Sequence, residues 1–131
     1  MQSLSLSILT VSRNSGYSLL RTFASLSSLL TNANSHIEWV IVDGCSTDQT
    51  VNCLQSIANL RLSNIKIVVE SDSGIYDAMN KACSFSLGDY ILFLNAGDCV
   101  VTNTVVQFLE NIPMSPAIFS FSYFLVEPRY N

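Results

Sequence analysis

Short apolar runs alternate with segments of helical periodicity along this 131-residue chain, and this alternation most constrains its fold. Runs rich in β-branched and other apolar residues predict strands, at residues 4–11, 37–42, 65–69, 89–94 and 117–126. Apolar residues at helical spacing predict helices, at residues 17–30, 51–58, 75–83 and 102–109. Strands that alternate with helices through short links indicate an α/β domain with a mostly parallel sheet and helices on both faces.

Several residues predict how the helices begin and which way they face. Ser46 and Gln49 match a capping box at the start of the second helix, and Thr102 is placed to cap the last one. In the third helix, Ile75 is the first of four residues expected to face inward.

Polar residues follow each of the first four predicted strands. These clusters are Ser12-Arg13-Asn14, Asp43-Gly44, Glu70-Ser71-Asp72 and Asn95-Ala96-Gly97-Asp98. In open parallel sheets, ligands bind beyond the carboxyl ends of the strands. We therefore expect all four clusters to meet at one edge and to form the site.

The Asn95–Asp98 cluster supports two interpretations. Carboxylate and carbonyl oxygens suit a hard cation such as Mg²⁺ or Mn²⁺. Ala96 and Gly97 have almost no side chain, which leaves room for a phosphate beside the backbone. The same four residues are also good turn formers, with Gly97 free to adopt a positive φ.

Each of the other clusters also supports two interpretations when it is taken alone. Asp43 can bind a nucleoside hydroxyl or be an ordinary loop residue before a helix. Asp72 can line a site or cap the third helix, and Arg13 can contact a base or be solvated. Asp77 and Lys81 can be an exposed ion pair, or can face a nucleotide together with Asn80.

Composition excludes several classes of function. The formal charge is −4 and the 6 Lys and Arg residues are scattered, so no basic stripe for nucleic acid exists. With one histidine and no C-x-x-C pair, no zinc constellation is available. We interpret the four cysteines as small apolar side chains in a reducing compartment, and we expect the chain to be cytoplasmic. Peripheral contact with the inner face of the membrane stays open.

Two other doubly wound folds fit the residues poorly. A dinucleotide-binding domain requires G-x-G-x-x-G after its first strand, where this chain has V-S-R-N-S-G. A phosphoacceptor domain requires acidic residues where Arg13 and Asn14 stand.

The order of the motifs is more specific than any one of them. The sequences W-V-I-V-D-G-C-S-T-D-Q-T, S-D-S-G-I-Y-D-A-M-N-K-A and G-D-Y-I-L-F-L-N-A-G-D follow S-I-L-T-V-S-R-N in that order. Together they resemble the family-two glycosyltransferases, and most of all the bacterial branch that builds surface polysaccharides. The resemblance implies the GT-A fold, a Rossmann-like three-layer sandwich, over nearly the whole chain up to Asp98.

The resemblance also implies a site for a nucleoside diphosphate sugar, with a UDP-sugar as the first expectation. It places Ser12 and Asn14 near the base and ribose, and Asp43 at the nucleoside. The loop at Asp72 and the helix carrying Asp77, Asn80 and Lys81 would line the donor site. Asn95 would face the ribose or sugar, and Asp98 would hold the divalent cation, Mn²⁺ or Mg²⁺, that bridges the diphosphate. The acceptor would be a saccharide or a lipid-linked saccharide.

Departures from the family pattern qualify these expectations. Gly44 stands where an acidic residue is common, Arg13 stands where an aromatic residue is frequent, and Asn95 and Gly97 leave one carboxylate in the metal motif. Family members continue past the fifth strand into the region of the general base. We therefore expect residues 1–131 to be the donor-binding part of an inverting enzyme. The alternative is a truncated, non-catalytic domain that binds a nucleotide sugar or self-associates through its last strand.

Overall fold

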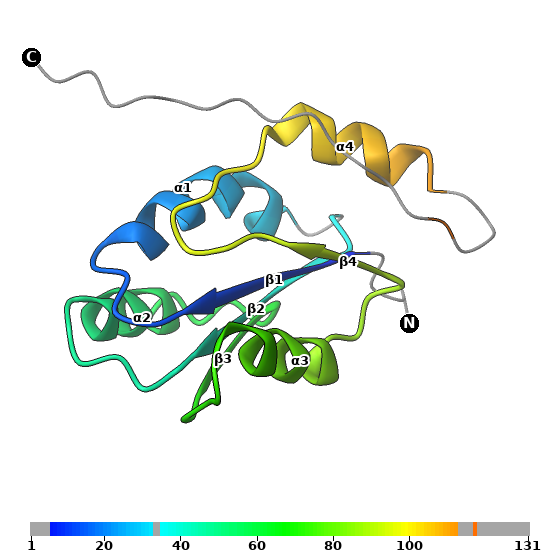
Figure 1. Ribbon diagram of the computed structural model, residues 1–131. Coiled ribbons are helices and arrows are strands. Elements are labelled where there is room, and N and C mark those ends of the chain that lie inside the picture. The colour runs from blue at the N-terminus through cyan, green and yellow to red at the C-terminus, as the bar shows by residue number, and fades with distance from the viewer. Residues whose placement is uncertain (1–5, 33–34, 113–116, 118–131) are drawn as a thin grey trace, which may run out of the picture.

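The computed structural model describes residues 6–32, 35–112 and 117, and it contains four strands and four helices within them (Figure 1). The strands are β1 (Leu6–Ser12), β2 (Ile37–Asp43), β3 (Ile65–Val69) and β4 (Tyr90–Phe93). The helices are α1 (Ser18–Thr31), α2 (Thr50–Ala58), α3 (Ile75–Phe85) and α4 (Thr102–Glu110). Each predicted element from residue 4 to residue 109 is therefore present, whereas residues 118–126 of the predicted fifth strand lie outside the described part.

The strands form one sheet in the order β3-β2-β1-β4, and every pairing is parallel. The two central strands, β1 and β2, are buried along their whole length. This explains why their sequences are almost continuously apolar, since a strand covered on both faces needs no polar side. The α/β fold with a parallel sheet is confirmed.

Helices cover both faces of the sheet and make three layers (Figure 1). On one face, Leu26 of α1, Ile57 of α2 and Val105 of α4 share a core with Trp39 of β2. On the other face, α3 packs the small side chains Ala78 and Ala82 against β1 and β2. Small residues let α3 lie close to the sheet, so its first turn begins beside the strand ends.

Buried polar bonds link β4 to the centre of the sheet. The indole N–H of Trp39 donates to the hydroxyl of Thr10 at 2.8 Å, and that hydroxyl donates in turn to the carbonyl oxygen of Leu94. Phe23 stacks on Trp39 with ring centroids 6.1 Å apart. The start of the Asn95–Asp98 segment is therefore held by the core.

Three local predictions are wrong. Ser46 does not cap α2, because its hydroxyl donates to Asp43 and the helix begins only at Thr50. Thr102 is the first residue of α4 rather than its cap. Ile75, the first residue of α3, is 51% exposed instead of facing the core, because α3 packs on the sheet through Ala78 and Ala82.

The cysteines behave as small apolar side chains only in part. Cys53 is buried in the core, and burial raises the pKa of its thiol. Cys45 and Cys99 are exposed, so that interpretation is wrong for them. Among the helices described, none combines the length and apolar character needed to cross a bilayer.

Candidate functional site

The polar clusters after β1, β2 and β3 start side by side. Ser12 pairs with Asp43 in the register of β1 and β2, and Asp43 pairs with Val69 of β3. The backbone continues the ladder past the strands, because the N–H of Gly44 donates to the carbonyl of Ser12 at 2.9 Å. The predicted meeting of these loops at the carboxyl edge is confirmed.

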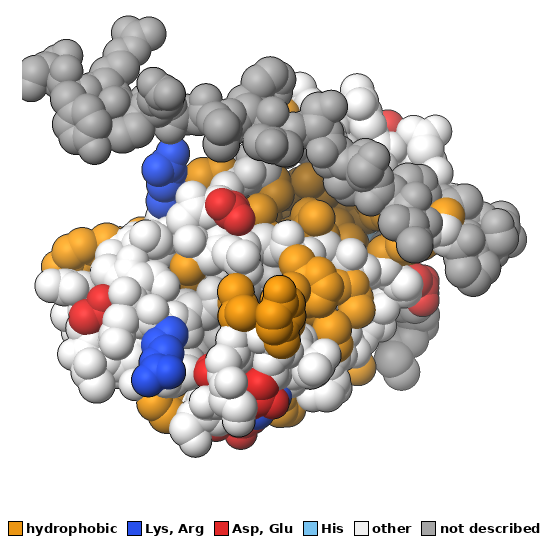
Figure 2. Space-filling view, viewed as in Figure 1, with side chains coloured by type: hydrophobic (Ala, Val, Ile, Leu, Met, Phe, Trp, Pro, Cys, Tyr) orange, Lys and Arg blue, Asp and Glu red, His pale blue; other side chains and the backbone are white. Residues whose placement is uncertain are grey.

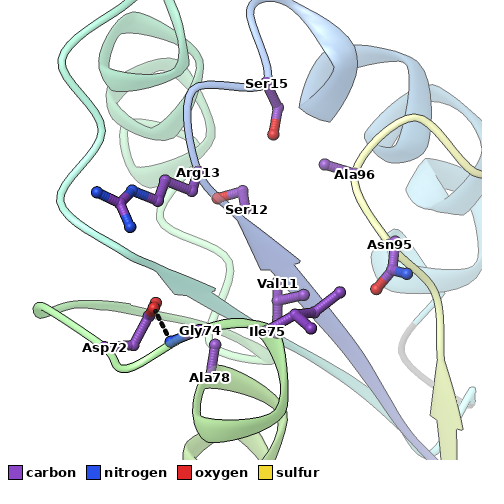
Figure 3. A pocket seen from close by; sticks show the side chains of 10 residues that line it. All are labelled: Val11, Ser12, Arg13, Ser15, Asp72, Gly74, Ile75, Ala78, Asn95 and Ala96. Atoms are coloured by element: carbon purple, nitrogen blue, oxygen red, sulfur yellow. Dashed lines mark hydrogen bonds between the residues drawn. The ribbon is translucent and has the colours of Figure 1, made fainter.

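A cavity of about 420 Å³ opens at this edge, between the β1 loop, the β4 loop and the start of α3 (Figure 3). Its lining residues are Val11, Ser12, Arg13, Ser15, Asp72, Gly74, Ile75, Ala78, Asn95 and Ala96. A cavity of this size is within the range of small-molecule sites. Its floor is apolar, from Val11, Ile75 and Ala78, and its polar groups stand around the rim.

Asp43 lies beneath this rim and is fully buried. Its Oδ1 accepts hydrogen bonds from the hydroxyls of Ser12 at 2.7 Å and Ser46 at 2.6 Å, and its Oδ2 accepts from the Ser46 N–H at 2.8 Å. The carboxylate therefore joins the loop after β1 to the loop after β2. It does not line the cavity.

Asn14 and Asp48 also hold these two loops together through hydrogen bonds. The Asn14 side-chain oxygen accepts from the Thr47 N–H at 2.8 Å, and the Asn14 N–H donates to the Ser46 hydroxyl at 2.8 Å. The Asp48 carboxylate accepts from the Gly16 N–H at 2.9 Å. Arg13, in this loop, lines the cavity with its side chain extended away from Asn95 and Ala96, on the side of Asp72 (Figure 3).

The loop between β3 and α3 is held by charged groups of α3 itself. Lys81 bonds the carbonyl of Ser71 and pairs with Glu70 at 3.6 Å and Asp77 at 3.5 Å. Asp77 accepts from the Ser73 N–H at 2.9 Å, and this bond, with Lys81 nearby, holds the pKa of Asp77 below its usual value. The expected Asp77–Lys81 ion pair is present, and it positions Asp72 beside the cavity.

The Asn95–Asp98 segment forms the predicted turn. The Asp98 N–H donates to the Asn95 carbonyl at 2.9 Å, and Gly97 has a φ of 98°, which few residues other than glycine adopt. The Gly97 N–H also donates to the hydroxyl of Thr22 in α1 at 2.9 Å. The turn is therefore fixed to α1, with Asn95 and Ala96 facing the cavity.

Few side chains near this turn could bind a metal ion. No group of three or more His, Cys, Asp or Glu side chains that could hold a metal occurs among the described residues. Asp98 is exposed and supplies one carboxylate. Mg²⁺ is often bound by one or two carboxylates together with phosphates and water, and Asp98 would supply one such carboxylate.

The predicted site residues thus separate into two groups. Ser12, Asp72 and Asn95 line the cavity. The remaining predicted residues lie outside its lining: Asn14, Asp43, Asp77, Asn80, Lys81 and Asp98. Four other lining residues were not predicted. Ser15 and Ala96 had no predicted side-chain role, and Ile75 and Ala78 were not predicted to lie in the floor of the cavity. The i, i+3 spacing of Ile75 and Ala78 indicates a shared helix face, but the sequence did not reveal that this face borders a cavity.

Comparison with known proteins agrees with this architecture. Residues 7–124 match the family described as glycosyl transferase family 2. A putative teichuronic acid biosynthesis glycosyltransferase, TuaG of Bacillus subtilis, is 33% identical over 95 residues, which are 72% of this chain and 38% of TuaG. The Escherichia coli glucosyltransferase WfaP, described as using UDP-Glc and a diphosphoundecaprenol-linked GlcNAc, is 30% identical over 82% of this chain and 42% of its own.

Solved structures share the fold. The S. aureus protein TarS, in complex with UDP-GlcNAc, superposes with a TM-score of 0.69 and 24% identity, over 81% of this chain and 30% of its own. A Pyrobaculum calidifontis mannosyltransferase with GDP-Man and Mn²⁺ gives a TM-score of 0.69 at 18% identity, over 86% of this chain and 34% of its own. The chain therefore spans well under half the length of these relatives. On its fold, its ordered motifs and the match over residues 7–124, the chain belongs to glycosyl transferase family 2.

Proposed function

We propose that this chain is the donor-binding part of a glycosyltransferase of bacterial surface polysaccharide synthesis. The donor in this proposal is a nucleoside diphosphate sugar, with a UDP-sugar as the first candidate. The observation that carries the proposal is the cavity at the carboxyl ends of β1 and β4, with Ser12, Arg13, Asp72 and Asn95 on its rim. The relatives TuaG and WfaP, which are named for polymer or lipid-linked saccharide synthesis, support a saccharide or lipid-linked acceptor.

Different residues of the rim would bind different parts of the nucleotide sugar. The base and ribose would lie between Arg13 and Asp72, and the diphosphate would lie toward Asn95 and Ala96, where the small side chain lets phosphate approach the backbone. Asp43, Asn14, Asp77 and Lys81 would act from outside the cavity by holding its loops. These residues are thus positioning residues in this proposal, and preorganised loops reduce the entropy that binding costs.

A divalent cation, when bound, would neutralise the charge of the departing diphosphate. Asp98 is the carboxylate that would hold it, and its backbone N–H is bonded to the backbone carbonyl of Asn95 in the same turn. In the inverting reaction, the acceptor hydroxyl would bond to the anomeric carbon as the bond to the diphosphate breaks. A general base would take the hydroxyl proton.

Titration calorimetry with UDP, GDP and their sugars, with and without Mn²⁺, tests the proposal. We expect binding that Mn²⁺ strengthens, and we expect Asp98→Asn to weaken the Mn²⁺-dependent binding by about tenfold or more. Asp89→Asn is the matched control, because it removes the same charge at the opposite end of β4. If no nucleotide binds the wild-type chain with or without Mn²⁺, the proposal is wrong.

A second candidate function is association with another copy of the chain. Hydrophobic side chains gather on the face over β4 and α3 (Figure 2). Ile91 and Phe93 of β4 are each 44% exposed, and the outer edge of β4 pairs with no strand among the described residues. Exposed apolar side chains on an unpaired strand favour pairing with another chain.

A further inference from the structure

Gly44 and Asp72 lie close together at the rim of the cavity, although they belong to different loops. A Cβ atom added at Gly44 would lie 2.6 Å from Oδ2 of Asp72 and 3.4 Å from Cδ of Arg13. Side-chain carbons do not approach other atoms that closely, so the Asp72 carboxylate occupies the space that a side chain at position 44 would take. The absence of a side chain at Gly44 therefore permits the present position of Asp72.

The two oxygens of this carboxylate have different surroundings. Oδ1 accepts a hydrogen bond from the Gly74 N–H at 3.0 Å, which fixes the orientation of the group (Figure 3). Oδ2 accepts no hydrogen bond from any residue in the described part of the chain, and no ion pair there joins it to Arg13. Asp72 and Arg13 both line the cavity, so this acceptor lies at the cavity edge beside Gly44.

We propose that Asp72 selects the nucleobase by accepting a hydrogen bond from an imino N–H, which uracil and guanine carry and cytosine and adenine lack. This inference rests on the proposed function, since it assumes that the cavity holds a nucleoside diphosphate. A carboxylate only accepts hydrogen bonds, whereas a guanidinium only donates them. Uracil offers N3–H to Asp72 and a neighbouring carbonyl oxygen to Arg13. Cytosine instead turns the lone pair of N3 toward the carboxylate.

The ratio of UDP affinity to CDP affinity tests this assignment. UDP and CDP have the same ribose and diphosphate. Removing a negative charge from the protein should therefore change both affinities equally, and the ratio of the affinities reports on the base alone. We expect the wild-type chain to prefer UDP by about tenfold or more, the value of one hydrogen bond to a charged acceptor. Asp72→Asn should bring the ratio close to one while keeping the bond from Gly74, because the amide oxygen still accepts it. GDP and ADP are the equivalent purine pair.

Two further variants separate base recognition from damage to the loop. Gly44→Ala should reduce the preference with the carboxylate intact, because the new methyl group must displace Asp72. Combining Gly44→Asp with Asp72→Ala should restore part of the preference, since it returns a carboxylate to the same space from the other loop. Asp89→Asn is the control for charge and should leave the ratio unchanged.

The outcomes distinguish this inference from the proposed function. If the wild-type chain binds UDP and CDP equally well, the imino assignment is overturned while nucleotide binding stands. If Asp72→Asn weakens both nucleotides equally, the carboxylate binds the ribose hydroxyls and the assignment is again overturned. If no nucleotide binds at all, both proposals fail.

Discussion

At the scale of single residues, backbone conformation shows where the loops around the cavity are strained. Cys45 has a φ of 60°, in the left-handed region, where a Cβ atom is crowded by the carbonyl oxygen. Asn14, at a φ of 48°, is also left-handed, but asparagine tolerates this region and its side chain is bonded to Thr47. Cys45 is exposed, so packing of its side chain offsets little of the cost.

We expect Cys45→Gly to raise the free energy of unfolding by about 1 kcal/mol, because glycine adopts a positive φ without that crowding. Urea denaturation monitored by circular dichroism measures the change. Cys99→Gly is the matched control, since Cys99 is also exposed but does not have a positive φ. The control should lose stability, because glycine adds freedom to the unfolded chain. A loss of stability in Cys45→Gly as well would contradict the argument.

At the scale of elements, the start of α2 depends on the carboxylate of Asp48, which also bonds the loop after β1. Asp48 accepts a hydrogen bond from the Thr50 N–H at 3.0 Å, and it also accepts from Gly16 in the loop after β1. Hydrogen bonding to Thr50, and also to Gly16, lowers the pKa of Asp48 below its ordinary value of 3.8. The carboxylate thus joins a helix start to the loop that carries Arg13.

This shift predicts how stability depends on pH. Because the folded-state pKa of Asp48 is depressed, its contribution is complete above about pH 3.8, the unfolded value, and is lost as the pH falls through the lower folded value. Asp48→Asn should therefore be less stable than wild type at pH 6, with the gap closing below pH 3.8. Denaturation midpoints from pH 6 to pH 3 measure the gap. A gap for Asp48→Asn that is constant across this range would exclude the linkage.

At the scale of the whole molecule, the two edges of the sheet differ. Lys66 of β3 has its ammonium group 3.4 Å from Glu38, a buried residue of β2, and a lysine on an edge strand discourages pairing with other chains. β4 has no such charge, and its Ile91 and Phe93 lie on the same face as the first turn of α3. The second candidate function therefore predicts association through the β4 edge.

Replacing Ile91 and Phe93 together with threonine should shift the chain toward the monomer. Threonine keeps the strand propensity of these positions but removes the apolar contact surface. Light scattering over a range of concentrations measures the mass. Leu60→Thr is the control, because Leu60 is 49% exposed but lies beyond the end of α2. Equal masses for wild type and the double variant would exclude β4 as the association surface.

The sequence by itself determined the order and type of the elements and the edge at which the polar clusters meet. These features follow from local periodicity, and a parallel sheet necessarily brings successive strand ends to one side. The family followed from the same ordered motifs, with G-I-Y-D-A-M-N-K and F-L-N-A-G-D as the most specific, and the match over residues 7–124 confirms it.

Only the tertiary structure decided which polar residues face the cavity. Asp43 and Asp72 are both acids that follow apolar strands, yet the carboxylate of Asp43 is buried and accepts three hydrogen bonds, whereas Asp72 lines the cavity. The capping box at Ser46 failed because the Ser46 hydroxyl donates instead to Asp43, three residues earlier at the end of β2. The bond from Ser12 to Asp43 joins residues that are 31 apart in the chain, and no local sequence pattern contains that information.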